Sequence, residues 1–173
     1  RDDDGIRASF TSIEPSVRDL DDADLEAILG LLGLTRADLD PELPPRLANT
    51  GNTHPVIVLA EQRTFDDFSF DPDAVRALLD DRGWPATITV ALRAASDRFQ
   101  ARNLFPVGRI TEDPATGSAA ASFGAYLRAL GAVDAPAVAV IEQGAHVGRP
   151  GELTVDIPVE GGITVSGHAV AIV

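Results

Sequence analysis

One short segment combines the residue types that could bind a small molecule. It covers residues 110–131 and reads ITEDPATGSAAASFGAYLRALG. The first N–H groups of a helix have no partner within the helix and carry a partial positive charge, so they attract anions. Gly117 would let a ligand approach the backbone, and Ser118 would add a hydroxyl donor. Glu112 and Asp113 bring carboxyl groups to the same place, so the segment indicates an anion site beside two acids.

The same residues could do no more than begin a helix. Asp113 followed by Pro114 is a common pair at a helix start, and Thr116 could cap the helix alone. Spacing by itself favours this simpler interpretation. Capping and ligand binding therefore both stay open at this point.

The element that must position these groups is a helix over residues 119–130. The segment is apolar almost all round, with Arg128 near its C-terminal end. Such a helix is buried on most faces. Its small side chains would let a sheet close around it, as a barrel would around a central rod. The helix start would then open at the mouth of the barrel.

The remaining sequence predicts an α+β fold with a strongly bent antiparallel sheet. Two further helices are indicated by apolar spacing, and the second has Asp71 as its cap and Gly83 just past its end. Short β-rich runs with alternating polarity predict the strands. The helices cover residues 21–34 and 71–83, the strands cover 6–13, 55–60, 86–94, 97–105, 135–144, 151–160 and 162–173, and a loop covers 40–54.

Composition excludes several classes of function. The 173 residues carry a formal net charge of −13 with only 14 Lys and Arg, which opposes binding to nucleic acid. The absence of Cys removes thiolate metal sites, and three scattered His make a His-rich metal site improbable. There is no apolar run long enough to cross a bilayer and no signal-peptide pattern, so we expect a cytoplasmic protein without a membrane partner.

Several segments resemble a known family. EDPATGSAAASFGAYL, preceded by ARNLFPVGRI and followed by EQGAHVGRPGEL, is similar to the C-terminal half of the PhzF-like isomerases. These are the phenazine-biosynthesis relatives within the diaminopimelate-epimerase fold. TGNTHPVIVLA resembles a loop and strand of the same half. The similar segments follow one another in the family's order over most of the chain.

The resemblance implies a barrel around the central helix and an active site at the helix start. Asp113 and Ser118 would be catalytic, and Thr116, Gly117 and Ser118 would bind a substrate carboxylate. The chemistry implied is isomerisation by acid/base proton transfer, with no metal or organic cofactor. Because this chain has no thiol, the mechanism of the related racemases that use a pair of Cys is excluded.

Other polar residues are weighed beside this site. His54 follows Gly-Asn-Thr at the start of a strand, where it would either face the substrate or serve as a hydrogen-bonded structural residue. We expect His146 and His168 at the surface or in packing roles. Arg102 and Arg149 could pair with either carboxyl group of the segment or with a ligand carboxylate.

The chain departs from the family in one respect. The resemblance implies a protein of two lobes that are similar to each other. In the family, the first lobe carries a Gly-Asn-Pro segment and the Glu thought to be the principal acid/base. Neither is visible here, so we expect residues 1–173 to form one lobe holding part of an active site. The missing first lobe would leave an apolar surface uncovered, so we expect either a homodimer that buries this surface or a first lobe supplied elsewhere. The alternative is a stand-alone or truncated non-catalytic domain that binds a small anion or self-associates.

Overall fold

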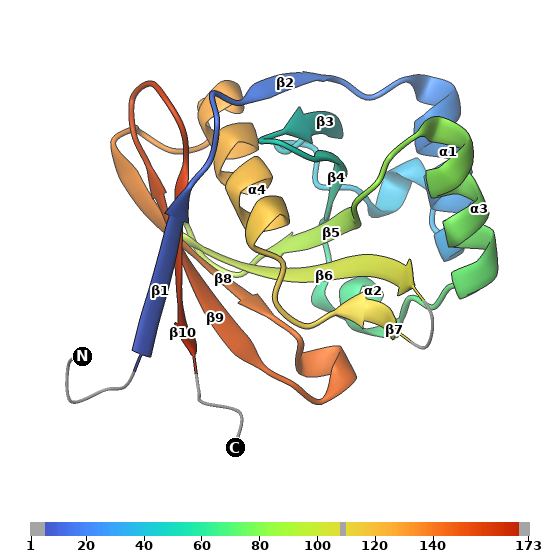
Figure 1. Cartoon of the computed structure of the whole chain (residues 1–173). Coiled ribbons are helices and arrows are strands. Elements are labelled where there is room, and N and C mark those ends of the chain that lie inside the picture. The colour runs from blue at the N-terminus through green and yellow to red at the C-terminus, as the bar shows by residue number, and fades with distance from the viewer. Residues whose placement is uncertain (1–5, 108–109, 170–173) are drawn as a thin grey trace.

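Figure 1 shows the computed structural model of the chain, which describes residues 6–107 and 110–169. The strands are β1 (Ile6–Thr11), β2 (Ser16–Asp19), β3 (Arg46–Asn49), β4 (Thr53–Leu59), β5 (Ile88–Arg93), β6 (Arg98–Val107), β7 (Ile110–Asp113), β8 (Ala137–Gln143), β9 (Gly151–Ile157) and β10 (Thr164–Ala169). The α-helices are α1 (Asp22–Leu32), α2 (Gln62–Asp67), α3 (Pro72–Arg82) and α4 (Gly117–Leu130), and single 3₁₀ turns occupy Arg36–Asp38 and Ala145–Val147. Residues 170–173 of the last predicted strand lie outside the described residues.

The strands form one mixed sheet in the order β1-β10-β9-β8-β6-β5-β4-β3-β2, with β7 paired to β6. The predicted α+β class with a strongly bent sheet is confirmed. Most neighbours are antiparallel, but β4 and β5 are parallel, as are β6 and β8. A parallel pair needs a crossover between its strands. Here α2 and α3 provide the first crossover, and β7 and α4 provide the second.

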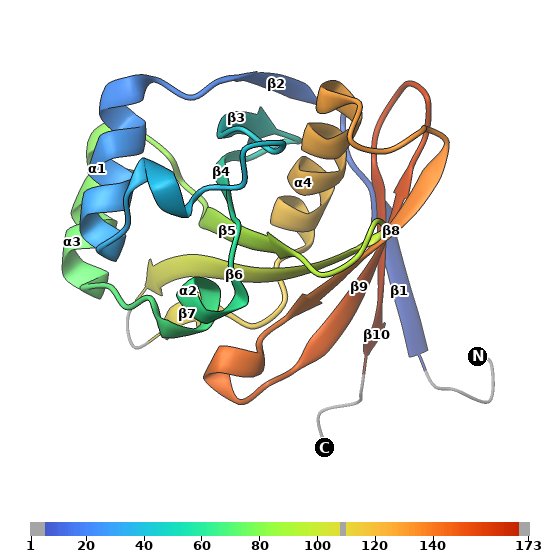
Figure 2. The ribbon, with the colours of Figure 1, turned by 180° about the vertical axis from the view of Figure 1, so that it is seen from behind.

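The sheet curls around α4, as Figures 1 and 2 show from opposite sides. Every residue of this helix from Ala119 to Leu127 is buried, which confirms the predicted central helix. A Cβ added at Gly124 would lie 2.7 Å from Val155 Cγ1 and 3.0 Å from Ile163 Cγ2. The small residues of α4 therefore let the sheet approach closely on this side.

A second apolar core lies on the other face of the central strands, beneath α1, α2 and α3. Along β4, Val56 and Val58 face the core around α4, while Ile57 and Leu59 face the core under the outer helices. This two-sided burial explains why the strand reads as a continuous apolar run. No helix in the described part of the chain has both the length and the apolar composition that a bilayer crossing requires.

The predicted ends of α3 are confirmed. The Asp71 carboxylate accepts a hydrogen bond from the backbone N–H of Asp73, and Gly83 ends the helix in the left-handed conformation. The predicted loop over residues 40–54 is wrong in part, because Arg46–Asn49 pairs as β3 between β2 and β4. Strands of four residues are too short to show a periodic pattern.

Candidate active site

A cavity of about 190 Å³ lies at the start of α4. Three elements meet there: β7 ends at Asp113, α4 begins at Gly117, and β5 is preceded by a loop through Thr87. Three of the five predicted site residues border the cavity, namely Asp113, Thr116 and Ser118. The complete lining is Asn52, Pro85, Ala86, Thr87, Phe105, Asp113, Thr116 and Ser118.

Within residues 6–107 and 110–169, no side chain caps the start of α4. Thr116 is the N-cap residue, but its hydroxyl donates to Asp113 Oδ2 at 2.8 Å instead of accepting from the helix. In the described part of the chain, no acceptor takes a hydrogen bond from the backbone N–H of Gly117, Ser118 or Ala119. The interpretation of this segment as a side-chain cap is therefore wrong. The N–H groups of the first turn are therefore available to an anion.

Gln143, at the end of β8, fixes the loop that precedes α4. Its amide nitrogen donates to the Asp113 carbonyl oxygen and to Thr116 Oγ1, the latter at 2.9 Å, and its amide oxygen accepts from the Thr116 N–H at 3.3 Å. Gln143 was not among the residues predicted from the sequence. The available signal was a Gln at a position of β8 whose alternation points inward, since its neighbours two and four residues earlier are buried.

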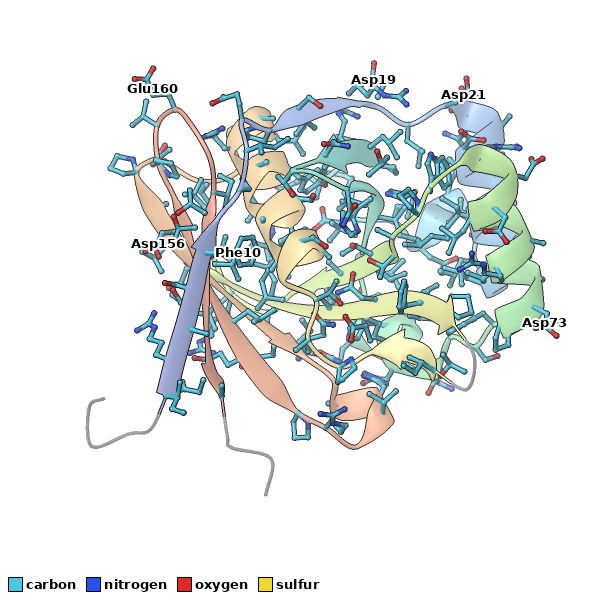
Figure 3. All side chains as sticks on the ribbon, in the orientation of Figure 1. Phe10, Asp19, Asp21, Asp73, Asp156 and Glu160 are labelled. Atoms are coloured by element: carbon cyan, nitrogen blue, oxygen red, sulfur yellow. The ribbon has the colours of Figure 1, made fainter. Side chains whose placement is uncertain are left out.

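Gly117 lies under an aromatic ring of the first strand. A Cβ at this position would come within 2.7 Å of Phe10 Cε1, so the ring of Phe10 covers the backbone at the helix start. Figure 3 labels Phe10 on β1, beside the lower end of α4. The absence of a side chain at Gly117 is thus required for packing, in addition to any approach of a ligand.

His54 lies behind Ser118 and has no exposed surface. Its Nε2 atom is 3.1 Å from Ser118 Oγ, and its Nδ1 atom is 3.2 Å from the carbonyl oxygen of Thr87 and 3.0 Å from the Thr87 hydroxyl. Burial lowers the pKa of His54 to about 4, against a smaller raising effect of the contact with the Thr87 backbone. The imidazole is therefore neutral near pH 7. It reaches the cavity through Ser118.

Glu112 does not share the site with Asp113, so the expectation that both carboxyl groups meet there is wrong. Successive residues of a strand point to opposite faces. Glu112 therefore turns away from the cavity, where its carboxylate pairs with the Arg102 guanidinium at 2.6 Å, with 8% of either side chain exposed. Arg102 also donates to the carbonyl oxygens of Phe65 and Phe68 and lies over the Phe68 ring.

The other two His lie away from the helix start. His146 Nε2 is 3.1 Å from Asp66 Oδ1, and its ring contacts Phe65 edge to face. His168 is exposed on β10. Both positions agree with the expected surface or packing roles.

Comparison with known proteins identifies the family. Residues 1–173 match the PhzC-PhzF family of phenazine biosynthesis-like proteins. The chain belongs to this family. It is 30% identical over 175 residues to the uncharacterized isomerase YddE of Escherichia coli O157:H7, covering 96% of this chain and 59% of that protein. Isomerase is therefore supported as the class of the family.

Solved structures support the fold. A predicted epimerase from Pseudomonas aeruginosa superimposes with a TM-score of 0.78 at 26% identity, over 97% of this chain and 57% of that one. A PhzF-family phenazine biosynthesis protein from Bacillus anthracis gives a TM-score of 0.77 at 20% identity, over 96% and 59%. The chain thus spans less than two thirds of the length of the relatives it matches.

Proposed function

We propose that this chain supplies the carboxylate-binding helix start and one acid/base group of a PhzF-like isomerase. The reaction class is proton transfer on a small carboxylate-bearing metabolite, as the family suggests. The observation that carries the proposal is the convergence of Asp113 and Ser118 on one small cavity at an uncapped helix start.

The backbone N–H groups and the Asp113 carboxyl group would have different roles. The free N–H groups of Gly117, Ser118 and Ala119 would hold the substrate carboxylate, helped by the partial positive charge of the helix end. Asp113 would move a proton at a carbon next to the bound carboxylate. Its carboxylate is oriented by Thr116, whose hydroxyl is held in turn by Gln143. A second acid/base on the opposite side of the substrate would come from outside this chain.

Binding can be tested on this chain without the true substrate. Titration with propionate, followed by backbone amide NMR, should shift the signals of Gly117, Ser118 and Ala119 more than any others. Shifts spread over the surface, with none at these three residues, would reject the helix start as the carboxylate site.

Catalysis is tested on the complete two-lobed protein. Small carboxylates with a C–H next to an activating group are incubated in D₂O, and deuterium uptake at carbon is followed by NMR. Asp113→Asn should abolish uptake and leave the fold intact, because Asn cannot exchange a proton with carbon. Asp156→Asn, which removes an exposed carboxylate of β9 that does not border the cavity, is the matched control. Uptake that survives in Asp113→Asn would remove Asp113 from the mechanism.

Two expectations from the sequence stay predictions. A homodimer, or contact with a first lobe, would cover the exposed apolar side chains of the edge strand β1, where Ile6 is 46% and Phe10 is 45% exposed. Light scattering on this chain tests the dimer, and a strictly monomeric species at high concentration would count against it.

The cytoplasmic location also stays a prediction. Carboxylate binding without deuterium uptake in the complete protein would favour the non-catalytic alternative.

A further inference from the structure

A chain of buried hydrogen bonds leads from the cavity into the sheet. It begins at Ser118, passes through His54 to Thr87 and ends at Asn103, whose side-chain oxygen accepts from the Thr87 hydroxyl at 2.9 Å and from the Thr89 hydroxyl at 2.8 Å. Behind Ser118, each of these residues is at most 2% exposed. Because these side chains are buried, we expect each of their hydrogens to point at a protein acceptor.

The direction of these hydrogen bonds follows from the groups that can only accept a hydrogen. The backbone carbonyl of Thr87 can only accept, so the hydrogen of the 3.2 Å contact belongs to His54 Nδ1. The Thr87 hydroxyl gives its own hydrogen to Asn103, so its oxygen also accepts from Nδ1. A neutral imidazole with a hydrogen on Nδ1 has a lone pair on Nε2. The hydrogen between Nε2 and Ser118 Oγ must therefore come from the Ser118 hydroxyl.

We infer that His54 is a positioning residue that turns the Ser118 proton away from the cavity, so that Ser118 presents an acceptor to the ligand. This changes the expected role of Ser118 as a donor to the carboxylate. It also places His54 behind the ligand-contacting group, whereas direct contact with the substrate was one of the two alternatives that its position in the sequence left open.

The Ser118 hydroxyl hydrogen is then not available to the ligand carboxylate, which the backbone N–H groups of the helix start would hold. The lone pairs of Ser118 Oγ favour a ligand with an N–H or O–H close to its carboxylate. This consequence rests on the proposed function, whereas the hydrogen-bond direction rests only on the geometry of the free chain.

The direction is tested first, without any ligand. The chain has three His, so a ¹⁵N spectrum of the imidazole nitrogens holds three sets of signals, and the set lost in His54→Gln belongs to His54. We expect a protonated Nδ1 and an unprotonated Nε2 near pH 7, and a changed Nε2 shift with an unchanged Nδ1 in Ser118→Ala. A protonated Nε2, or two protonated nitrogens, would overturn the inference. If His54→Gln does not fold, the Nε2 change in Ser118→Ala still identifies the signals.

The role is tested with a matched pair of ligands, propionate and lactate, which differ by one hydroxyl. The wild-type chain should bind lactate more tightly by about fivefold, the equivalent of one hydrogen bond. Ser118→Ala should remove this preference and leave propionate affinity unchanged. Equal weakening of both ligands in Ser118→Ala would show that Ser118 donates to the carboxylate, and would refute the inference.

The two proposals can fail separately. If neither acid binds at the helix start, the carboxylate site of the proposed function is wrong. The imidazole spectrum then still decides the orientation of Ser118 by His54.

Discussion

Lowering the pH should destabilise the protein through His54. The unfolded chain binds a proton at the ordinary His pKa of 6.5, whereas burial lowers the pKa of the folded state to about 4. Between these values the unfolded state binds more protons than the folded state, so stability falls as the pH decreases. The contribution of His54 is fully present above about pH 6.5 and is lost as the pH falls to about 4.

The size of the effect follows from the difference between the two pKa values. A separation of this size corresponds to about 3 kcal/mol when the full range is crossed, at 1.36 kcal/mol per unit. About 2 kcal/mol of it is lost between about pH 7 and about pH 5. This is a substantial share of the stability of a typical domain, which is about 5–15 kcal/mol.

Urea unfolding at the two pH values measures the effect, and the single Trp84, which is buried, reports it by fluorescence. Wild type and His54→Gln differ at this one residue, so the comparison isolates His54. His54→Gln should lose less stability than wild type between the two pH values, by about 2 kcal/mol. Ser118→Ala keeps the imidazole buried and should follow wild type. Parallel pH dependence in wild type and His54→Gln would refute the reasoning.

Three further predictions concern packing and the support of the site, each measured by urea unfolding. Gly124→Ala should lower the free energy of unfolding by about 1–3 kcal/mol, because its new methyl group meets an aliphatic carbon of β9 at 2.7 Å. Gly30→Ala in α1, which has open space around it, should raise the free energy of unfolding by about 1 kcal/mol. Glu112→Ala should cost about 3–5 kcal/mol by leaving Arg102 buried without its partner, and adding Arg102→Met should recover much of the loss. Gln143→Ala should cost about 1–3 kcal/mol by removing both donors and the acceptor that hold the loop before α4, and an unchanged midpoint would contradict its structural role.

Parts of the fold could be predicted because local composition decides them. The residues of α4 are apolar almost all round, and such a helix is stable only when most of its faces are buried. The Asp71 cap and the Gly83 end of α3 are likewise set by their own side chains, or by the lack of one. The convergence of Asp113 and Ser118 on one cavity agrees with the family resemblance, but its hydrogen-bond directions do not follow from the sequence.

Other parts depend on partners far away in the chain. Whether two neighbouring strands run parallel depends on the crossover between them, which periodicity does not reveal. Glu112 and Asp113 are adjacent and chemically similar, yet pleating sends one to Arg102 and the other to the cavity. The contacts of His54 join residues 33 and 64 positions away along the chain. Such pairings become visible only when the sheet is assembled.

The pairing of β1 with β10 has a consequence for the order in which the molecule can form. Ile6 lies opposite Ala169, and Thr11 lies opposite Thr164. Strand β1 therefore cannot pair with β10 until β10 has been synthesised. During synthesis, α4 is complete while β9 and β10, which cover one of its sides, have yet to leave the ribosome. Bringing β1 and β10 together closes a loop that contains most of the chain. This closure costs conformational entropy before the contacts between the two strands offset the cost. We therefore expect β9, β10 and β1 to pack over α4 late in folding, and until they do so the apolar helix is exposed to other chains.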